Sequence, residues 1–244
     1  MKQNDIFYIL PYTESTNNYA MGRIHAQKAV DGEAWFSSNQ LMGKGQRGKH
    51  WITEPGKNMA LSIVIKPSPH LITGPFYLSA IIALVCREFL SCYEERVKIK
   101  WPNDVYWGDR KAGGILVENI FVGKIWHWAV AGIGLNINQE AFDPSLSNPV
   151  SLKQITGRKH DPEEVAREIH NMILSALQKT EASSMESTLQ EYNRYLYKKG
   201  ESIRLKKGNA VFETTIRSVN NQCQLLTEDV MERAFEVGEV EWLL

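Results

Sequence analysis

The chain has 244 residues, 43% of them hydrophobic and 23% charged, which suits one sizeable core with a small second module. Lysine plus arginine and aspartate plus glutamate both number 28, so the formal net charge is zero and the broad positive field of a general nucleic-acid binder is excluded. Three scattered cysteines and six histidines form neither a disulfide framework nor a zinc motif. No signal-peptide core is present, and the longest apolar run, residues 76–86, is far short of the roughly 20 residues that span a membrane. We therefore expect a cytoplasmic protein without a membrane partner.

Short apolar runs bounded by turn residues predict strands at residues 6–10, 33–38, 59–66, 97–101, 115–122 and 125–131, the last two joined as a hairpin. Helical spacing predicts helices at residues 15–27, with Ser15 as its cap, and 73–94, with Pro75 in its first turn. Residues 39–57 hold four glycines and few apolar residues. We expect them to form a long surface loop, and loops of that length inside a compact domain are usually functional or disordered.

The last third of the chain predicts two helices and then a group of short strands. Asp161, with proline after it and glutamate three residues later, predicts the start of a helix whose apolar face carries Val165, Ile169, Ile173 and Leu177. A second helix is predicted at residues 186–199. Alternating runs then predict a small all-β module with strands at residues 202–206, 211–219, 224–226 and 233–237, and Gly200 is the expected boundary.

The first candidate site is GKGQRGKHW, residues 43–51. Its glycines let the backbone approach a ligand closely, and its cations, Lys44, Arg47 and Lys49, can neutralise anionic oxygens. The spacing is not that of a Walker motif, and no helix follows as in a dinucleotide fingerprint. A solvated basic loop explains the segment equally well, whereas a nucleic-acid contact is disfavoured by the zero net charge.

The second candidate is KWPNDVYWGDRKAGGILVE, residues 100–118. Pro102 cannot join a strand ladder, so the first strand ends there and leaves Asn103 and Asp104 at its mouth. Lys111 follows the next turn, just before two glycines. An amide, a carboxylate and a lysine at neighbouring strand ends suit a phosphate and its metal. A hairpin with a surface Asp–Lys pair is the open alternative.

Two weaker candidates complete the set. In AGIGLNIN, residues 131–138, Gly132 and Gly134 interrupt a strand, which indicates a bulge or close backbone approach to a ligand. Asn136 can donate and accept at an adenine edge, or it can be a structural asparagine in a turn. The hydroxyls of ESTN, residues 14–17, can bind a neutral polar ligand, but helix capping alone also explains them.

In this order and with these separations, the four segments resemble the biotin protein ligase family over about residues 6–140, and KWPND with RKAGGILVE is the most specific part. The closing residues 238–240 resemble the end of the family's C-terminal barrel. The resemblance implies an α+β fold: a central mixed sheet flanked by helices, similar to class II synthetases, in residues 1–199, and an SH3-like β-barrel in residues 200–244. It also implies the single-function class, without an N-terminal DNA-binding domain.

Family roles carry over to the matching positions. Those that resemble its biotin- and ATP-binding residues are Ser15, Thr16, Asn17, Gln40, Gly43, Lys44, Gly45, Gln46, Arg47, Trp51, Asn103, Gly114 and Asn136. Among them, Ser15, Thr16 and Gln40 resemble the residues that hold the ureido ring of biotin. Gln46 departs from the family pattern, which has arginine there, and it therefore offers a neutral amide in place of a cationic fork.

The positions that resemble the family's catalytic residues are Lys111, Lys49 and Asp104, with Asp104 also the expected Mg²⁺ ligand. Lys111 resembles the lysine that faces the biotin carboxylate and the α-phosphate, and Gly114 lines the biotin tail. Trp51 resembles the indole that packs against adenine, Asn136 the residue that reads its edge, and residues 43–49 the loop that orders over the adenylate.

The resemblance implies a ligase that activates biotin with ATP and Mg²⁺ as biotinyl-5'-AMP and passes biotin to a lysine of a biotin carboxyl carrier protein. Such chemistry calls for positioning and charge neutralisation, and a closing loop must protect the water-sensitive mixed anhydride. A homodimer is a possible assembly, and no DNA partner is expected. The alternatives are a lipoate or octanoate ligase, which the Gly43 loop and Trp101-Pro102 disfavour, and a non-catalytic biotin or nucleotide sensor.

Overall fold

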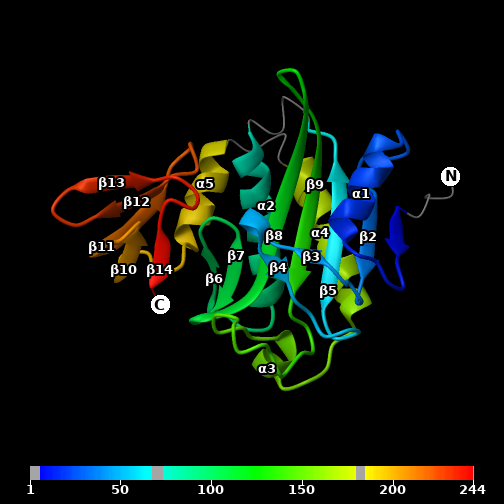
Figure 1. Cartoon of the computed structure of the whole chain (residues 1–244), viewed down its shortest axis with the longest axis horizontal. Helices are drawn as coiled ribbons and strands as arrows, with labels where there is room; N and C mark the ends of the chain where they lie inside the picture. The colour runs from blue at the N-terminus through cyan, green and yellow to red at the C-terminus, as the bar shows by residue number, and fades with distance from the viewer. Residues whose placement is uncertain (1–5, 68–73, 180–184, 244) are drawn as a thin grey trace.

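A seven-stranded mixed sheet forms the centre of the computed structural model, which describes residues 6–67, 74–179 and 185–243 (Figure 1). In spatial order its strands are β1 (Phe7–Ile9), β2 (Ala34–Ser37), β5 (Met59–Ile65), β9 (Ile125–Leu135), β8 (Arg110–Val122), β7 (Asp104–Trp107) and β6 (Val97–Lys100). β1 and β2 are parallel, and each other neighbouring pair is antiparallel. The predicted central mixed sheet is confirmed.

Helices cover the two faces of this sheet unequally. α2 (Pro75–Ser91) and α4 (Pro162–Lys179) pack on one face over the main core. On the other face lies α1 (Thr16–His25), whose Ala20 and Ile24 meet Trp35, Val64 and Val130. A helix is about 10 Å across and a seven-stranded sheet about 29 Å wide. Part of the second face therefore lies open beside the N-terminus of α1.

The predicted helix starts are confirmed, but one helix end is wrong. Ser15 caps α1, Pro75 is the first residue of α2, and Pro162 is the first of α4; residue 73 lies outside the described residues. α5 (Met185–Arg194) ends five residues before the predicted position. The cause is pairing with the edge strand β6: the Ile99 N–H donates to the Tyr195 carbonyl, and the Tyr197 N–H donates to the Ile99 carbonyl. Because residues 195–197 pair with this strand, they do not continue the helix.

The glycine-rich segment predicted as a loop contains a small hairpin. β3 (Gly43–Lys44) pairs with β4 (His50–Trp51), and the short 3-10 turn η1 (Gln46–Gly48) joins them. The hairpin fixes the direction in which the side chains of this segment leave the backbone.

The C-terminal strands form the predicted β module, but it is an open antiparallel sheet. Its order is β13 (Glu232–Phe235), β12 (Leu225–Glu228), β11 (Ala210–Val219), β10 (Ser202–Lys207) and β14 (Glu241–Leu243). The expected closure into an SH3-like barrel is wrong, because the edge strands β13 and β14 do not pair. A turn in which the Glu239 N–H donates to the Glu236 carbonyl (3.0 Å) connects them. The domain boundary at residue 200 stays a prediction.

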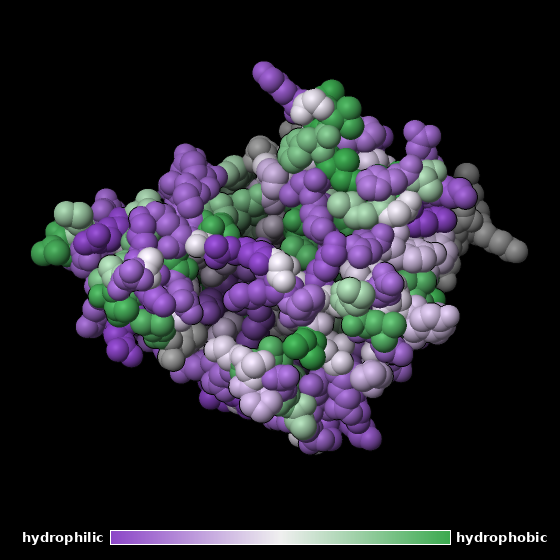
Figure 2. Space-filling view, viewed as in Figure 1, coloured by the Kyte–Doolittle hydropathy of each residue, from purple (hydrophilic) through white to green (hydrophobic). Residues whose placement is uncertain are grey.

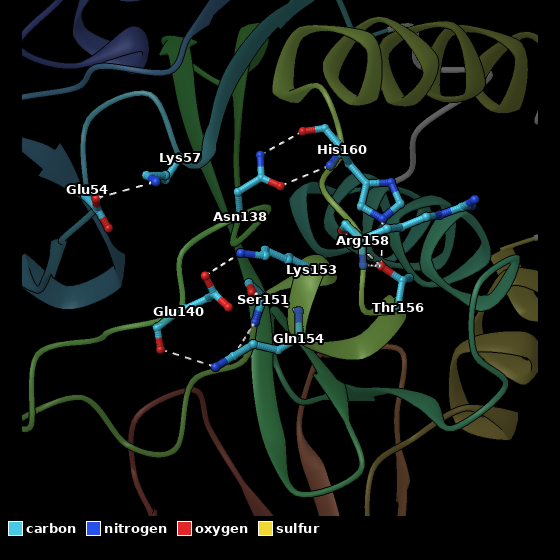
Figure 3. Close-up of polar contacts among 10 residues, drawn as sticks. All are labelled: Glu54, Lys57, Asn138, Glu140, Ser151, Lys153, Gln154, Thr156, Arg158 and His160. Carbon is cyan, nitrogen blue, oxygen red and sulfur yellow. Dashed lines mark hydrogen bonds and ion pairs between the residues drawn. The ribbon is translucent and has the colours of Figure 1, made fainter.

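Side-chain hydrogen bonds fix the segment that follows β9 (Figure 3). Ser151 caps α3 (Leu152–Thr156) in a reciprocal capping box with Gln154. The Asn138 amide donates to the His160 carbonyl (2.7 Å) and its oxygen accepts from the His160 N–H (3.0 Å). These bonds hold the segment between β9 and α4 in place beside the end of β9. Among the described residues, no helix has the length and apolarity that crossing a membrane requires.

Candidate functional site

A row of small side chains crosses the open face of the sheet. Successive register partners in this row are Ser37, Ala60, Gly134, Gly114, Asp104 and Lys100, on β2, β5, β9, β8, β7 and β6. Directly opposed residues of neighbouring antiparallel strands point to the same face. The row is therefore a trough floored by backbone, with charged groups at one end.

A hydrogen-bonded polar cluster closes the other end of the trough. The Oε1 atom of Gln40 accepts from the Thr16 N–H (2.9 Å) and the Thr16 hydroxyl (3.2 Å). The Ser62 hydroxyl donates to Asn17 Oδ1 (2.5 Å) and lies 2.7 Å from Thr16 Oγ1. All carry no charge and most are buried, so they suit a neutral polar group rather than an ion. Ser15 accepts from the Asn18 N–H (3.4 Å), which confirms its capping role.

Glu118 joins this cluster to the glycine-rich hairpin. Its Oε2 atom accepts from Asn17 Nδ2 (2.7 Å), and its Oε1 atom lies 3.6 Å from Lys44 Nζ. The Asn17 amide is thereby oriented with its oxygen towards Ser62. Gly132 leaves the space that Asn17 fills, since a Cβ there would lie 2.9 Å from Asn17 Cγ. The sequence predicted a bulge or a close approach to a ligand at this glycine, whereas the structure shows a close approach to the Asn17 side chain.

A β-bulge places Lys111 at the charged end of the trough. Val105 pairs with Gly113, but Tyr106 pairs with Lys111, so Ala112 is an extra residue in β8. Without it, the alternation along the strand would turn Lys111 to the opposite face. The bulge instead puts its side chain on the face that carries Asp104.

Lys111 and Asp104 form an ion pair above Gly114. The distance from Lys111 Nζ to Asp104 Oδ1 is 2.7 Å, and both side chains are partly exposed. A Cβ on Gly114 would lie 3.2 Å from that carboxylate oxygen and 3.5 Å from the lysine Nζ. Asn103 is buried and donates to the Ile115 carbonyl (2.6 Å), so it anchors the turn that presents Asp104. The pair predicted from the motif is present, and its position at the trough favours a site over a surface pair.

Trp51 lies across the trough between its two ends. A Cβ on Gly134 would be 2.5 Å from Trp51 Cε2, so the indole packs directly on the glycine backbone. Its ring centroid is 6.0 Å from Lys111 Nζ. The indole Nε1 is buried and has no hydrogen-bond partner among the described residues. An aromatic face beside a lysine and a carboxylate suits a base attached to a phosphate.

The tip of the hairpin reaches the C-terminal sheet. Gly45 donates to the Lys49 carbonyl (2.7 Å) and Lys49 to the Gln46 carbonyl (3.2 Å), which closes the turn. Arg47 adopts a left-handed backbone (φ 57°), and its guanidinium lies against Gly238 of the C-terminal sheet. Gly43 is closely packed by Gln40 and Trp51.

Asn136 is buried at the end of β9. Its Nδ2 donates to the carbonyls of Lys111 (3.3 Å) and Val150 (3.2 Å), which ties the bulged strand to the segment beyond β9. This is the structural asparagine that the sequence left open as an alternative. An adenine contact by the same residue stays a prediction.

Sequence reasoning missed three residues of this face: Ser62, Glu118 and Lys100. Ser62 is the one polar residue in the apolar strand MALSIVI, which was an available signal. Glu118 and Lys100 lie inside the second motif, but only strand register brings them to the trough.

One end of this trough thus offers uncharged hydrogen-bond partners, the other a lysine–carboxylate pair, and an indole lies between them. Such a site fits an elongated ligand with a neutral polar head and an anionic end beside an aromatic base. Proteins that join a carboxylic acid to a nucleotide phosphate form the class with these needs.

The comparisons agree with this class. Residues 9–136 match the model of the Biotin/lipoate A/B protein ligase family, and the chain belongs to that family. It is 37% identical over 145 residues to the bifunctional ligase/repressor BirA of Escherichia coli, and 34% over 163 residues to the biotin–[acetyl-CoA-carboxylase] ligase of Paracoccus denitrificans. These alignments cover 57% and 64% of this chain, and 43% and 66% of the relatives, so the chain spans less than half of the first relative's length.

Solved structures share the fold over nearly the whole chain. The biotin protein ligase of Aquifex aeolicus in complex with biotin and ATP superposes with a TM-score of 0.80 over 97% of this chain and 98% of that one, at 23% identity. The Leishmania major enzyme in complex with biotin gives a TM-score of 0.65 at 22% identity. The seven-stranded sheet and the C-terminal sheet therefore occur together in known proteins.

Proposed function

We propose that this protein is a biotin protein ligase. It activates biotin with ATP as biotinyl-5'-AMP, and it then transfers biotin to a lysine of a biotin carboxyl carrier protein. The observation that supports this best is the trough itself, with the Thr16–Gln40 cluster at one end and Lys111 at the other. The relatives named as biotin ligases support the same substrate.

The first step joins two anions. A biotin carboxylate oxygen attacks the α-phosphorus of ATP, the bond to the bridging oxygen breaks, and pyrophosphate leaves with its electron pair. Lys111 offsets the negative charge that builds up where the two groups meet, and it can leave Asp104 to do so because both side chains are partly exposed. Trp51 holds the adenine, and Lys49 adds positive charge from the loop.

The second step transfers the acyl group. The amine of the carrier lysine attacks the acyl carbon of the anhydride, the carbon–oxygen bond to phosphate breaks, and AMP leaves. The ammonium of that lysine must first lose a proton. We assign the covering of the anhydride and the exclusion of water to the Gly43–Lys49 loop, whose Lys44 is paired with Glu118.

Mg²⁺ fits this arrangement as the partner of ATP. Among the described residues there is no group of three or more acidic, histidine or cysteine side chains that could cage a metal. Mg²⁺ needs no such cage when substrate phosphates supply most ligands, and one carboxylate then suffices. We assign that contact to Asp104; the ion would neutralise phosphate charge there.

The polar head cluster favours biotin over lipoate. The ureido ring of biotin can add hydrogen bonds to the groups of Thr16, Gln40 and Ser62, whereas a dithiolane ring offers these polar groups nothing beyond the bonds that they already make to one another. An octanoyl chain likewise has no polar group at its far end to bond to this cluster.

Exchange of labelled pyrophosphate into ATP tests the proposal. We expect exchange that requires biotin and does not occur with lipoate or octanoate. A carrier domain should then become labelled on lysine in the presence of biotin, ATP and Mg²⁺. Biotin binding without exchange would instead identify a sensor. A cytoplasmic location, the absence of sequence-specific DNA binding and a homodimeric state stay predictions.

A further inference from the structure

Lys100 belongs to the charged end of the trough, but the reaction described above gives it no task. It is the last residue of the row, directly opposite Asp104 in the β6–β7 ladder. Its Nζ donates to the Tyr106 hydroxyl (3.4 Å) and lies 5.1 Å from the Tyr106 ring centroid and 5.5 Å from that of Trp242. The side chain is thus half-buried between two aromatic rings.

No carboxylate neutralises this lysine. Asp104 is already paired with Lys111 at 2.7 Å, and no other acidic group of the described chain lies within ion-pair distance of Lys100 Nζ. Burial lowers the pKa of Lys100 to about 8; Asp104 raises it, and Lys111 and Lys49 lower it further. Lys100 and Lys111 thus share one aspartate: Asp104 is the ladder partner of Lys100 and the ion-pair partner of Lys111. A half-buried positive charge without a paired anion raises the free energy of the folded protein, and a bound anion would offset this cost.

We propose that Lys100 binds the phosphates of ATP that lie beyond the α-phosphate, and that Trp242 of the C-terminal sheet positions it. This inference rests on the proposed function. Lys111 lies above Gly114, and Lys100 is two strands further along the row, about 10 Å away at the usual strand spacing. The leaving pyrophosphate would therefore extend from Lys111 towards Lys100.

The C-terminal sheet is firmly attached at this point. Trp242 lies on β14 opposite Leu205 of β10, and its ring packs against Lys100. The indole N–H of Trp101, next in sequence to Lys100, donates to the carbonyl of Cys223 (2.9 Å). The sheet thereby fixes both the end of β6 and the direction of the lysine, which gives it a part in nucleotide binding.

Lys100→Met tests the role because it removes the charge and keeps an unbranched side chain between the rings. Calorimetry with inorganic pyrophosphate and with ATP should show affinities about 10- to 100-fold weaker, the range expected for a charge-assisted hydrogen bond, while biotin affinity stays unchanged. Lys100→Arg should restore much of the loss. Lys98→Met is the matched control: Lys98 lies on the same strand and face, also above an aromatic ring (Tyr195, 5.6 Å), and should leave all affinities unchanged.

Trp242→Leu should weaken pyrophosphate binding several-fold, again without an effect on biotin. Unchanged pyrophosphate affinity in Lys100→Met, or an equal loss in Lys98→Met, would overturn the inference while biotin-dependent exchange still supported the proposed ligase. Conversely, a protein that binds pyrophosphate through Lys100 yet shows no such exchange would contradict the ligase function and leave the phosphate site standing.

Discussion

Substituting Gly134 with alanine should weaken ATP binding selectively. The new Cβ would lie 2.5 Å from Trp51 Cε2 and 2.8 Å from its Nε1, whereas carbon atoms in ordinary contact are 3.5–4.0 Å apart. The indole must therefore move by about 1 Å or more, and the β3–β4 pairing between Gly43 and Trp51 prevents the backbone from following. Loss of a base–aromatic stack costs about 1–3 kcal/mol, or roughly 5- to 150-fold in affinity.

Calorimetric titrations with ATP and with biotin separate this effect from general damage. We expect the ATP affinity of Gly134→Ala to fall within that range and the biotin affinity to stay unchanged, because the head cluster lies beyond Gly132. Gly22→Ala is the control, since a Cβ at Gly22 has open space around it. In a Trp51→Ala background, Gly134→Ala should have no further effect. If Gly134→Ala and Trp51→Ala both fold normally and bind ATP as the wild type does, Trp51 is not the adenine platform.

Three further outcomes are expected. Lys111→Ala should reduce biotin-dependent pyrophosphate exchange by about 10²–10³ while its unfolding transition stays cooperative; near-normal exchange would reduce the lysine to a surface role. Burial, assisted by Arg158, lowers the pKa of His160 below 6.5, so the folded protein binds this proton less readily than the unfolded chain, and its share of stability is lost as the pH falls below 6.5. Denaturant midpoints between pH 7.5 and 5.5 should then fall less for His160→Asn, and an equal fall would contradict this cause. Arg47→Ala should release biotinyl-adenylate several-fold faster in dissociation measurements while Gln46→Arg changes the rate little; the reverse would show that the family's arginine was never replaced.

Local signals in the sequence were sufficient to predict most elements, and they singled out several of the residues that the structure brings to the trough. Caps and first-turn prolines depend on neighbouring residues alone, so Ser15 and Pro162 could be placed without the fold. The interrupting glycines predicted a bulge or a close approach to a ligand, and the structure shows the side chains of Asn17 and Trp51 packed against Gly132 and Gly134. Residue type was therefore informative where the local structure depends on one residue and its immediate neighbours.

The parts that could not be predicted depend on register between distant strands. The bulge at Ala112, which turns Lys111 to the site, exists only in relation to β7, and no residue in RKAGG requires it. The position of Lys100 opposite Asp104 depends on the same ladder. Likewise, alternating strands alone are equally compatible with a closed barrel and with the open C-terminal sheet, because closure depends on whether the edge strands β13 and β14 pair.

The position of Arg47 connects the C-terminal sheet to the departure at Gln46. The Arg47 guanidinium occupies the space above Gly238, where a side chain would displace it. To supply the positive charge that Gln46 lacks, Arg47 must leave this contact and turn towards the trough. That movement costs little because it concerns the end of an exposed, flexible side chain, while Lys44 and Glu118 keep the base of the hairpin in place. We expect the negative charge of the adenylate to favour the inward position. The C-terminal sheet would then compete with the nucleotide for Arg47, and the intermediate itself would supply the attraction that closes the loop over it.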